Sequence, residues 1–201
     1  MRIEKFFPTL VGFSENKNHK AIENNLVEKC YKLKKEIKSG GQNWIAKNTY
    51  NTSYTYNLFN DEDFKLLNDW VVSEIKSYAD SIGYDNNLTC NSAWFNSYKK
   101  YDYQDVHEHA PNTISAIYFL KSNPNTCAKT YFYSSCYDGL QPKSKIENID
   151  TNATISVNPL SGLLVVFRSN IKHSVEQQLS DDERISIAYN FKIGEQLNDK
   201  S

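Results

Sequence analysis

The sequence predicts a mainly β fold of the α+β class, a jelly roll braced by helices from the N-terminal part of the chain. Apolar residues recur at helical spacing before Leu88 and fall into short strand-like runs separated by turns after it. About eight short strands that follow two helices fit a jelly roll. The 201 residues, 39% of them apolar, suffice for one domain with a substantial core. We therefore expect a single domain over 1–201, with a helical support region at 1–88 and a jelly-roll core at 89–195.

The N-terminal region is predicted to hold one short strand and two helices. Weakly alternating aromatic and aliphatic residues predict an opening strand over 3–13. Apolar residues spaced by three or four predict an amphipathic helix over 18–38, which Gly40 and Gly41 end. The same spacing predicts a second helix over 62–83, with Gly83 as its stop.

The rest of the chain is predicted to form strands. The runs SAIYFL at 115–120 and GLLVVF at 162–167 are the most strand-like, and Asn- and Pro-containing turns separate the candidates. The predicted strands lie at 91–98, 103–109, 113–121, 129–134, 153–157, 162–167, 172–176 and 184–193.

Charge and composition narrow the classes of partner. A formal net charge of −1 and a pI near 6.4 argue against nucleic acid and anionic membranes as partners. No apolar stretch approaches the length of a membrane span, and the N-terminal residues do not resemble a signal peptide. The four cysteines form no CxxC pair, so we expect reduced thiols. The expected location is the cytoplasm, or the host cytoplasm if a phage encodes the protein.

Three of the four histidines predict a metal site. His107 and His109 are two residues apart, so on a regular strand both side chains point to the same face. His173 lies on a later predicted strand, and imidazole is a ligand for iron, zinc, copper and nickel. We expect His107, His109 and His173 to be the catalytic metal ligands.

The second ligand position leaves alternatives open. The usual non-haem iron triad has two histidines and one carboxylate, whereas the second position here is His109. Glu108 would face the opposite side of a regular strand, and a bulge would be needed to bring it in, so it is the reserve ligand. Asp105 lies on the histidine face and could support a ligand from behind.

A second group of residues predicts a site for a carboxylate cosubstrate. Arg184 can pair with a carboxylate through two hydrogen bonds, and Ser186 lies on the same face of the strand 184–193. Beside a metal, this pair predicts 2-oxoglutarate as the cosubstrate. Asn96 and Tyr98 share a strand face and could bind the same molecule, with Tyr118 as a weaker candidate.

The chain also resembles a known family in two stretches. WFNSYKKYDYQDVHEHAPNTISAIYFL at 94–120 and ISVNPLSGLLVVFRSNIKHSVEQQLSDDERISIAYNF at 155–191 resemble the 2OG-Fe(II) oxygenases of bacteria and their phages, which are related to prolyl hydroxylases. The shared elements are W-x-N, H-x-H, H-x-V, R-x-S and N-F, and the opening KFFPTLVG is similar as well. Departures from the family pattern fall at Ala110-Pro111, Ala116 and Arg168.

The resemblance implies a double-stranded β-helix, with Fe(II) at His107, His109 and His173 and 2-oxoglutarate at Arg184. The pair Asn96-x-Tyr98 is similar to the cosubstrate segment of AlkB-type demethylases. The function expected is a dioxygenase that uses Fe(II), 2-oxoglutarate and O2 to hydroxylate a protein side chain or a small molecule, releasing succinate and CO2. The alternatives are a cupin-type dioxygenase without a cosubstrate and a non-catalytic jelly-roll module that binds metal.

Overall fold

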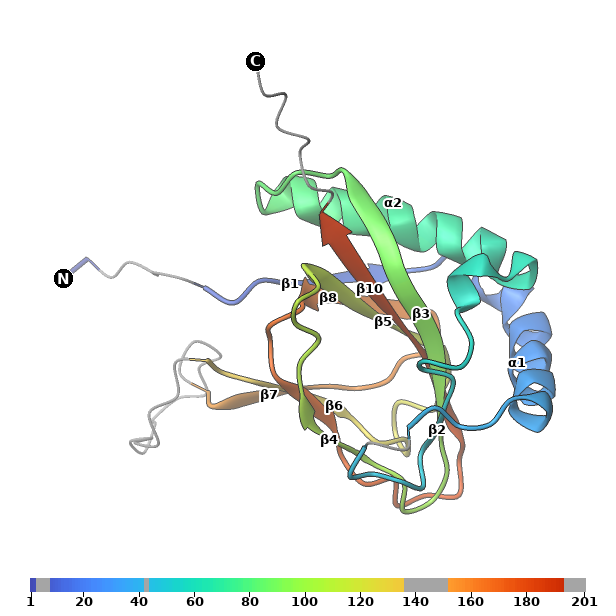
Figure 1. Ribbon diagram of the computed structural model, residues 1–201. Coiled ribbons are helices and arrows are strands. Elements are labelled where there is room, and N and C mark those ends of the chain that lie inside the picture. Colours follow the sequence, from blue (N-terminus) through green and yellow to red (C-terminus); the bar gives the residue numbers. More distant parts are fainter. Residues whose placement is uncertain (3–7, 42–43, 136–151, 194–201) are drawn as a thin grey trace.

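Two antiparallel β-sheets face each other and form the body of the protein. The computed structural model describes residues 1–2, 8–41, 44–135 and 152–193. The larger sheet has the strand order β1-β8-β5-β10-β3-β2 and the smaller one has the order β4-β9-β6-β7 (Figure 1). The strands are β1 (Val11–Glu15), β2 (Tyr50–Asn51), β3 (Leu88–Tyr98), β4 (Gln104–His107), β5 (Ile114–Lys121), β6 (Thr130–Tyr133), β7 (Thr154–Val157), β8 (Leu163–Arg168), β9 (His173–Val175) and β10 (Arg184–Ile193).

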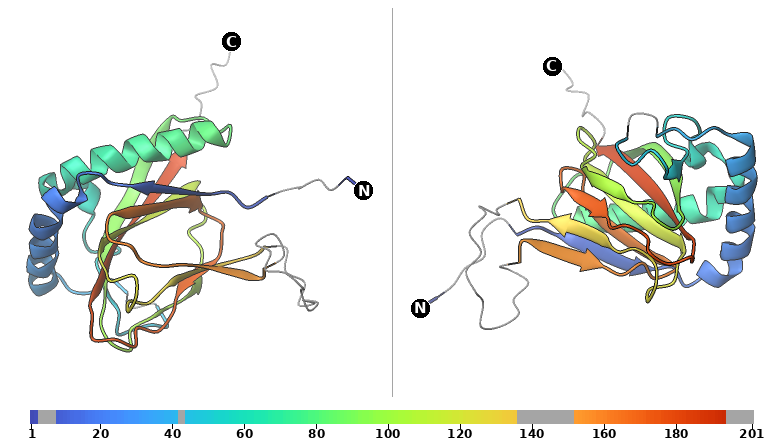
Figure 2. Two further views of the ribbon diagram at one scale, coloured as in Figure 1. Left: turned by 180° about the vertical axis from the view of Figure 1, so that it is seen from behind. Right: turned by 90° about the horizontal axis from the view of Figure 1, so that it is seen from below.

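Two helices cover the outer face of the larger sheet. They are α1 (His19–Glu36) and α2 (Lys65–Ser81), and two 3₁₀ turns, η1 (Leu58–Asn60) and η2 (Glu62–Phe64), precede α2. Figure 2 shows both helices on one side of this sheet, with the smaller sheet on the other. The predicted jelly roll braced by N-terminal helices is thus confirmed.

The side-chain alternation of the strands divides the interior into two compartments. On β5, Ala116 and Tyr118 face the helices and join the main core, whereas Ile117 and Phe119 face the smaller sheet. Because successive side chains on a strand point to opposite faces, the space between the sheets receives every second residue of each central strand. From β3, β8 and β10 these inward residues are Trp94, Asn96, Tyr98, Val165, Phe167, Arg184 and Ser186.

Most element boundaries agree with the sequence predictions to within a few residues, but three differ. The opening strand predicted at 3–13 is found at Val11–Glu15, while residues 3–7 lie outside the described part of the chain. The region 1–88 is not purely helical support, because β1 and β2 extend the two edges of the larger sheet. The strand predicted at 103–109 is β4, which ends at His107, and this changes how His109 is positioned.

Position 162 requires glycine for two reasons, its positive φ and the closeness of the His19 side chain. Its φ is +88°, and a Cβ there would lie 2.9 Å from Cγ of His19 and 3.0 Å from its Cβ. We expect Gly162→Ala to lower the free energy of unfolding by about 2–4 kcal/mol, because left-handed strain and overpacking add. Gly83→Ala is the matched control, since Gly83 has φ +75° but a Cβ added there would meet nothing within 4 Å, so that only strain of about 1–2 kcal/mol applies.

Urea unfolding of both glycine variants and the parent measures the difference. Equal losses in the two variants would show that the loop before β8 moves away from His19 at no cost, and would contradict the prediction.

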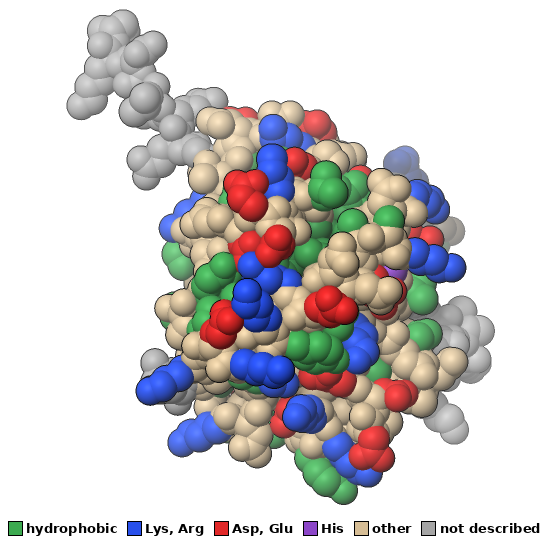
Figure 3. Space-filling view, turned by 90° about the vertical axis from the view of Figure 1, so that its right-hand side faces the viewer, with side chains coloured by type: hydrophobic (Ala, Val, Ile, Leu, Met, Phe, Trp, Pro, Cys, Tyr) green, Lys and Arg blue, Asp and Glu red, His purple; other side chains and the backbone are tan. Residues whose placement is uncertain are grey.

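The surface that carries α1 mixes charges of both signs. Figure 3 shows Lys and Arg side chains interspersed with Asp and Glu across this face. Lys29, for example, lies 3.0 Å from Asp61 and 2.5 Å from Asp63. Within the described residues, neither helix has the length and apolar run that crossing a bilayer requires.

Candidate metal centre and carboxylate site

Two of the predicted ligands are direct neighbours across adjacent strands. His107 on β4 pairs with His173 on β9, and Phe132 on β6 pairs with His173 from the other side. The centroids of the His107 and His173 rings lie 4.3 Å apart. The ring of Phe132 lies nearly parallel to that of His173, with 5.9 Å between centroids. The smaller sheet therefore holds two imidazoles side by side against an aromatic backing.

His109 reaches the same place from a loop. Because β4 ends at His107, the expectation that both histidines share a face of one regular strand is wrong. The His109 N–H instead donates to the carbonyl of Ser169, 2.8 Å away, and the side-chain amide of Asn112 donates to the carbonyl of His109 at the same distance. The Trp94 ring, 5.6 Å from the His109 ring, packs on its other side.

The imidazole nitrogens of the three histidines converge. Nδ1 of His107 donates to the carbonyl of Asp105 at 2.7 Å, and Nδ1 of His173 donates to that of Ile171 at 2.9 Å. A carbonyl only accepts, so both Nε2 atoms carry the lone pair that a metal needs. Nε2 of His109 lies 3.2 Å from Nε2 of His173, and the three ligand atoms lie within 4.8 Å of one another. Adjacent ligands about 2.1 Å from one ion are about 3 Å apart, so the arrangement fits a bound metal ion.

The electrostatic environment keeps these imidazoles neutral. Burial lowers the pKa of His107 and of His173. Burial, followed by the charge of His107, lowers the pKa of His109 to about 3. Metal binding requires neutral imidazole, so no proton has to leave these side chains at neutral pH before an ion binds.

Neither acid near the triad joins it. Glu108 is exposed and lies outside the group of converging ligand atoms, so no bulge brings the reserve ligand in. The Asp105 carboxylate accepts a hydrogen bond from the backbone N–H of Ala46 at 3.0 Å. Asp105 does support His107, but with its backbone carbonyl rather than with the carboxylate that the sequence suggested.

Arg184 is a buried cation whose hydrogen-bonding capacity is mostly unused. Its side chain is 0% exposed, and Nη2 donates to Oγ1 of Thr130 at 2.9 Å. Its Nε and Nη1 have no hydrogen-bond partner within the described part of the chain. The guanidinium carbon lies 4.9 Å from the centre of the Tyr98 ring and 5.1 Å from that of Phe119. Burial lowers the pKa of Arg184, but from an ordinary value so high that the group stays charged.

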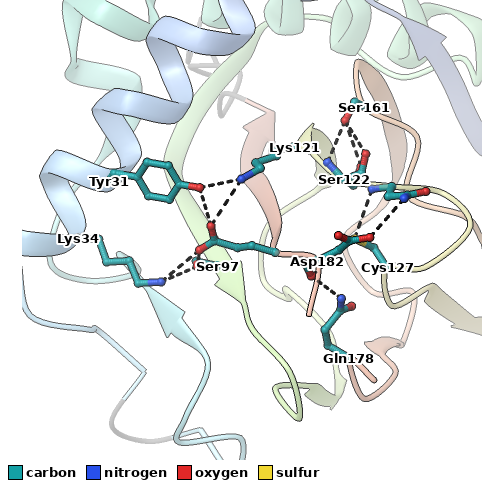
Figure 4. A network of polar contacts seen from close by, with 11 residues as sticks. Tyr31, Lys34, Ser97, Lys121, Ser122, Cys127, Ser161, Gln178 and Asp182 are labelled. Atoms are coloured by element: carbon teal, nitrogen blue, oxygen red, sulfur yellow. Dashed lines mark hydrogen bonds and ion pairs between the residues drawn. The ribbon is translucent and has the colours of Figure 1, made fainter. Parts of the chain in front are cut away.

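A polar network on the outer face anchors the strand that carries Arg184. Glu183 accepts hydrogen bonds of 2.6 Å from the hydroxyls of Tyr31 on α1 and Ser97 on β3 (Figure 4). Lys34 and Lys121 lie 3.4 and 3.9 Å from its carboxylate. Burial alone would raise the pKa of Glu183, but these hydrogen bonds and charges outweigh it and lower the pKa. Because neighbouring residues of a strand face opposite sides, holding Glu183 outward directs Arg184 into the space between the sheets.

Three of the other predicted cosubstrate residues lie near Arg184, and one does not. Tyr98 pairs with Arg184 across β3 and β10, and Asn96 pairs with Ser186 two residues further along. Oδ1 of Asn96 is buried without a hydrogen-bond partner. Tyr118 points to the face of the larger sheet that the helices cover, where its hydroxyl lies 2.8 Å from Nδ1 of His19. The structure therefore does not bring Tyr118 to this site.

Strand β6 connects the histidines with Arg184. Thr130, which contacts Arg184, and Phe132, which contacts His173, are two residues apart and share a face. That spacing corresponds to about 7 Å along a strand, so both groups lie against the same face of the smaller sheet, between the two sheets. Thr130 and Trp94 were not predicted as site residues. The alternation of TYFY at 130–133 places Thr130 on the face of Phe132, but only the fold brings that face to Arg184.

A cavity of about 700 Å³ lies beside the metal-binding side of this site. His107, His109 and Trp94 form part of its wall. The rest comes from the loop between α1 and α2, the middle of β3, the residues around β4 and Asn190 of β10. Access to the triad is therefore shaped by segments of the N-terminal region.

Solved structures share this fold at low sequence identity. A prolyl-4-hydroxylase from Pseudomonas putida matches with a TM-score of 0.62 and 15% identity, over 91% of this chain and 93% of the other. A prolyl hydroxylase from Trichoplax adhaerens, in complex with a hypoxia inducible factor peptide fragment, matches with a TM-score of 0.64 and 16% identity, over 91% and 83%. HygX from Streptomyces hygroscopicus, with nickel and 2-oxoglutarate bound, matches with a TM-score of 0.61 and 10% identity, over 92% and 83%.

The comparison at the level of families covers the jelly-roll core. The comparison with curated protein sequences finds no match. Residues 92–190, from β3 to β10, match the family described as "Putative 2OG-Fe(II) oxygenase". This range contains His107, His109 and His173 as well as Arg184 and Ser186. Residues 92–190 thus match the 2OG-Fe(II) oxygenase family, and the chain has a fold similar to that of prolyl 4-hydroxylases.

Proposed function

We propose that this protein is an Fe(II)- and 2-oxoglutarate-dependent dioxygenase that hydroxylates a protein side chain or a small molecule. The observation that carries the proposal is the pairing of two sites between the same two sheets. Three neutral histidines converge on one point, and a buried arginine, two of whose nitrogens have no partner among the described residues, contacts the same smaller sheet. The match of residues 92–190 to the 2OG-Fe(II) oxygenase family supports the same chemistry.

Each group of residues has a defined task in this proposal. His107, His109 and His173 would hold Fe(II) through their imidazole nitrogens, and Arg184 would pair with the distal carboxylate of 2-oxoglutarate. Bound iron and 2-oxoglutarate supply the oxidising chemistry, in which O2 is consumed and succinate and CO2 are released. Tyr98 keeps its proton, because burial raises its pKa to about 12, so it can donate a hydrogen bond beside Arg184. The sheets exclude bulk water from Arg184, which strengthens its attraction for a carboxylate.

A dioxygenase of the cupin type is the second candidate, because a three-histidine ligand set favours it. Such an enzyme uses no cosubstrate, so it would have no use for a buried cation beside the metal. The unused hydrogen-bonding capacity of Arg184 therefore favours the 2-oxoglutarate-dependent class. The unpaired Cys30, Cys90 and Cys127 are in keeping with a reducing compartment, and we place the protein in the cytoplasm.

The proposed cofactor chemistry is tested by anaerobic titration of the metal-free protein with Fe(II) and 2-oxoglutarate. We expect a visible metal-to-ligand charge-transfer band that requires both components. The band should be lost in His173→Ala, which removes a ligand. Stoichiometric Fe(II) binding without any band would contradict the 2-oxoglutarate proposal and favour the cupin-type or binding-module alternative.

A further inference from the structure

The cavity beside the triad has an acidic and aromatic wall. Asp105 and Glu108 contribute negative charge, and among the described residues that line it there is no lysine or arginine. Four aromatic side chains also contribute: Trp44, Tyr54, Tyr56 and Trp94. Tyr54 stands out from the surface, with 96% of its side chain exposed, so its ring face is available to a ligand. Cations are attracted both by carboxylates and by the faces of aromatic rings.

Two buried polar atoms of the residues that line the cavity have no hydrogen-bond partner among the described residues, one an acceptor and one a donor. Gln104 is 6% exposed, and its Oε1 has no hydrogen-bond partner although the residue lines the cavity. Glu108 makes no hydrogen bond or ion pair with any described residue, and one oxygen of Asp105 is occupied by the Ala46 N–H. The buried donor without a partner in this wall is Nε1 of Trp94. A buried acceptor without a partner is costly, so Oε1 of Gln104 favours a ligand group that donates a hydrogen bond.

We propose that the substrate carries a protonated amine or guanidinium, which Glu108, Asp105 and Gln104 bind while the aromatic wall packs on it. This inference rests on the proposed function, because the cavity borders His107 and His109. The cation serves recognition, and the carbon that is hydroxylated lies elsewhere on the same substrate. The role of Glu108 is thereby binding of the substrate rather than of the metal.

Paired probes separate charge from shape. Anaerobic protein loaded with Fe(II) and 2-oxoglutarate is titrated with Nα-acetyl-lysine amide and Nα-acetyl-arginine amide, and with their neutral counterparts built on norleucine and citrulline. Binding is followed by ligand-observed NMR, so no turnover is needed. We expect at least one cationic probe to bind about fivefold more tightly than its neutral counterpart, as for a partly exposed ion pair, and the preference to shrink in 0.5 M salt.

Two charge-matched variants identify the group responsible. Glu108→Gln should remove most of the preference, whereas Glu28→Gln, which removes an exposed carboxylate from α1, should leave it unchanged. A lysine-containing pentapeptide that binds more tightly than the lysine probe would assign the amine to a protein, and equal binding would assign it to a small molecule. Equal binding of cationic and neutral probes, or an unchanged preference in Glu108→Gln, would overturn the inference. If this inference fails while the unsubstituted protein still shows the charge-transfer band with Fe(II) and 2-oxoglutarate, the proposed function stands. If the unsubstituted protein shows no such band, the proposed function itself is refuted.

Discussion

Replacing Arg184 by methionine is expected to weaken 2-oxoglutarate binding strongly while leaving the metal-free protein at least as stable as the parent. The loss of a buried, charge-assisted pair should weaken 2-oxoglutarate binding by at least about 30-fold. The stability of the metal-free protein should not fall, because Arg184 is fully buried and leaves Nε and Nη1 without partners. Apolar replacements of such buried charges are often neutral or stabilising. Thermal and urea unfolding, with and without Fe(II) and 2-oxoglutarate, measure both effects.

The ligand-induced stabilisation is the sharper readout. At a 2-oxoglutarate concentration 100 times the Kd of the parent, the parent should gain about 2.7 kcal/mol, and Arg184→Met should gain less than about 1 kcal/mol. Ser186→Ala is the control on the same strand face, and it should lose far less because it removes only one neutral hydrogen bond. Arg184→Lys keeps the charge without the two-pronged geometry and should bind with intermediate affinity. An Arg184→Met protein that binds 2-oxoglutarate like the parent would assign the distal carboxylate to another residue.

The second large effect is expected at the unusual ligand position. His109→Ala should weaken Fe(II) binding by more than about 100-fold, since even residues behind a ligand contribute 10- to 100-fold. Glu108→Gln should retain both Fe(II) and the charge-transfer band, because Glu108 is exposed and does not converge with the ligand atoms. Fe(II) affinity is measured by competition with a coloured chelator.

Circular dichroism of both metal-free variants shows whether the fold is kept, which we expect because His109 lies in a loop at the edge of the cavity. The opposite result, with loss of iron in Glu108→Gln and retention in His109→Ala, would restore a conventional set of two histidines and a carboxylate. It would also remove the role that the substrate inference gives to Glu108.

A three-histidine site has an electrostatic consequence for the cosubstrate. With neutral ligands only, bound Fe(II) keeps its full double positive charge, whereas the usual carboxylate would cancel part of it. In the proposed enzyme 2-oxoglutarate, with its two negative charges, would balance the charge of the metal, and Arg184 would attract its distal end. An acidic cavity next to a more positive metal also keeps a cationic substrate away from the ion itself and at the carboxylates.

Much of the architecture was predictable from local patterns. The helix over 18–38 and the strands around 115–120 and 162–167 rest on apolar periodicity, which reflects burial on one face and depends little on distant contacts.

The prediction for β4 was wrong at its end. Residues 103–109 read as one strand, but the ladder with β9 shifts register after Gln104 and stops at His107. Pairing with a partner strand decides such an end, and the partner lies more than sixty residues away.

The sequence by itself determined which chemical groups are available for the predicted site. It supplies imidazoles that can bind a metal and a guanidinium that can pair with a carboxylate, and strand alternation places Asn96 and Tyr98 on one face. Only the tertiary structure decided which of these groups meet. The orientation of β5 in the sheet points Tyr118 toward the helices, and a hydrogen bond to Ser169 brings His109 to the other two histidines. The tertiary structure also joined Thr130 to Arg184 and Trp94 to His109. The physical reason is that alternation fixes which residues share a face of one strand, whereas register and loop closure between distant strands fix which faces come together.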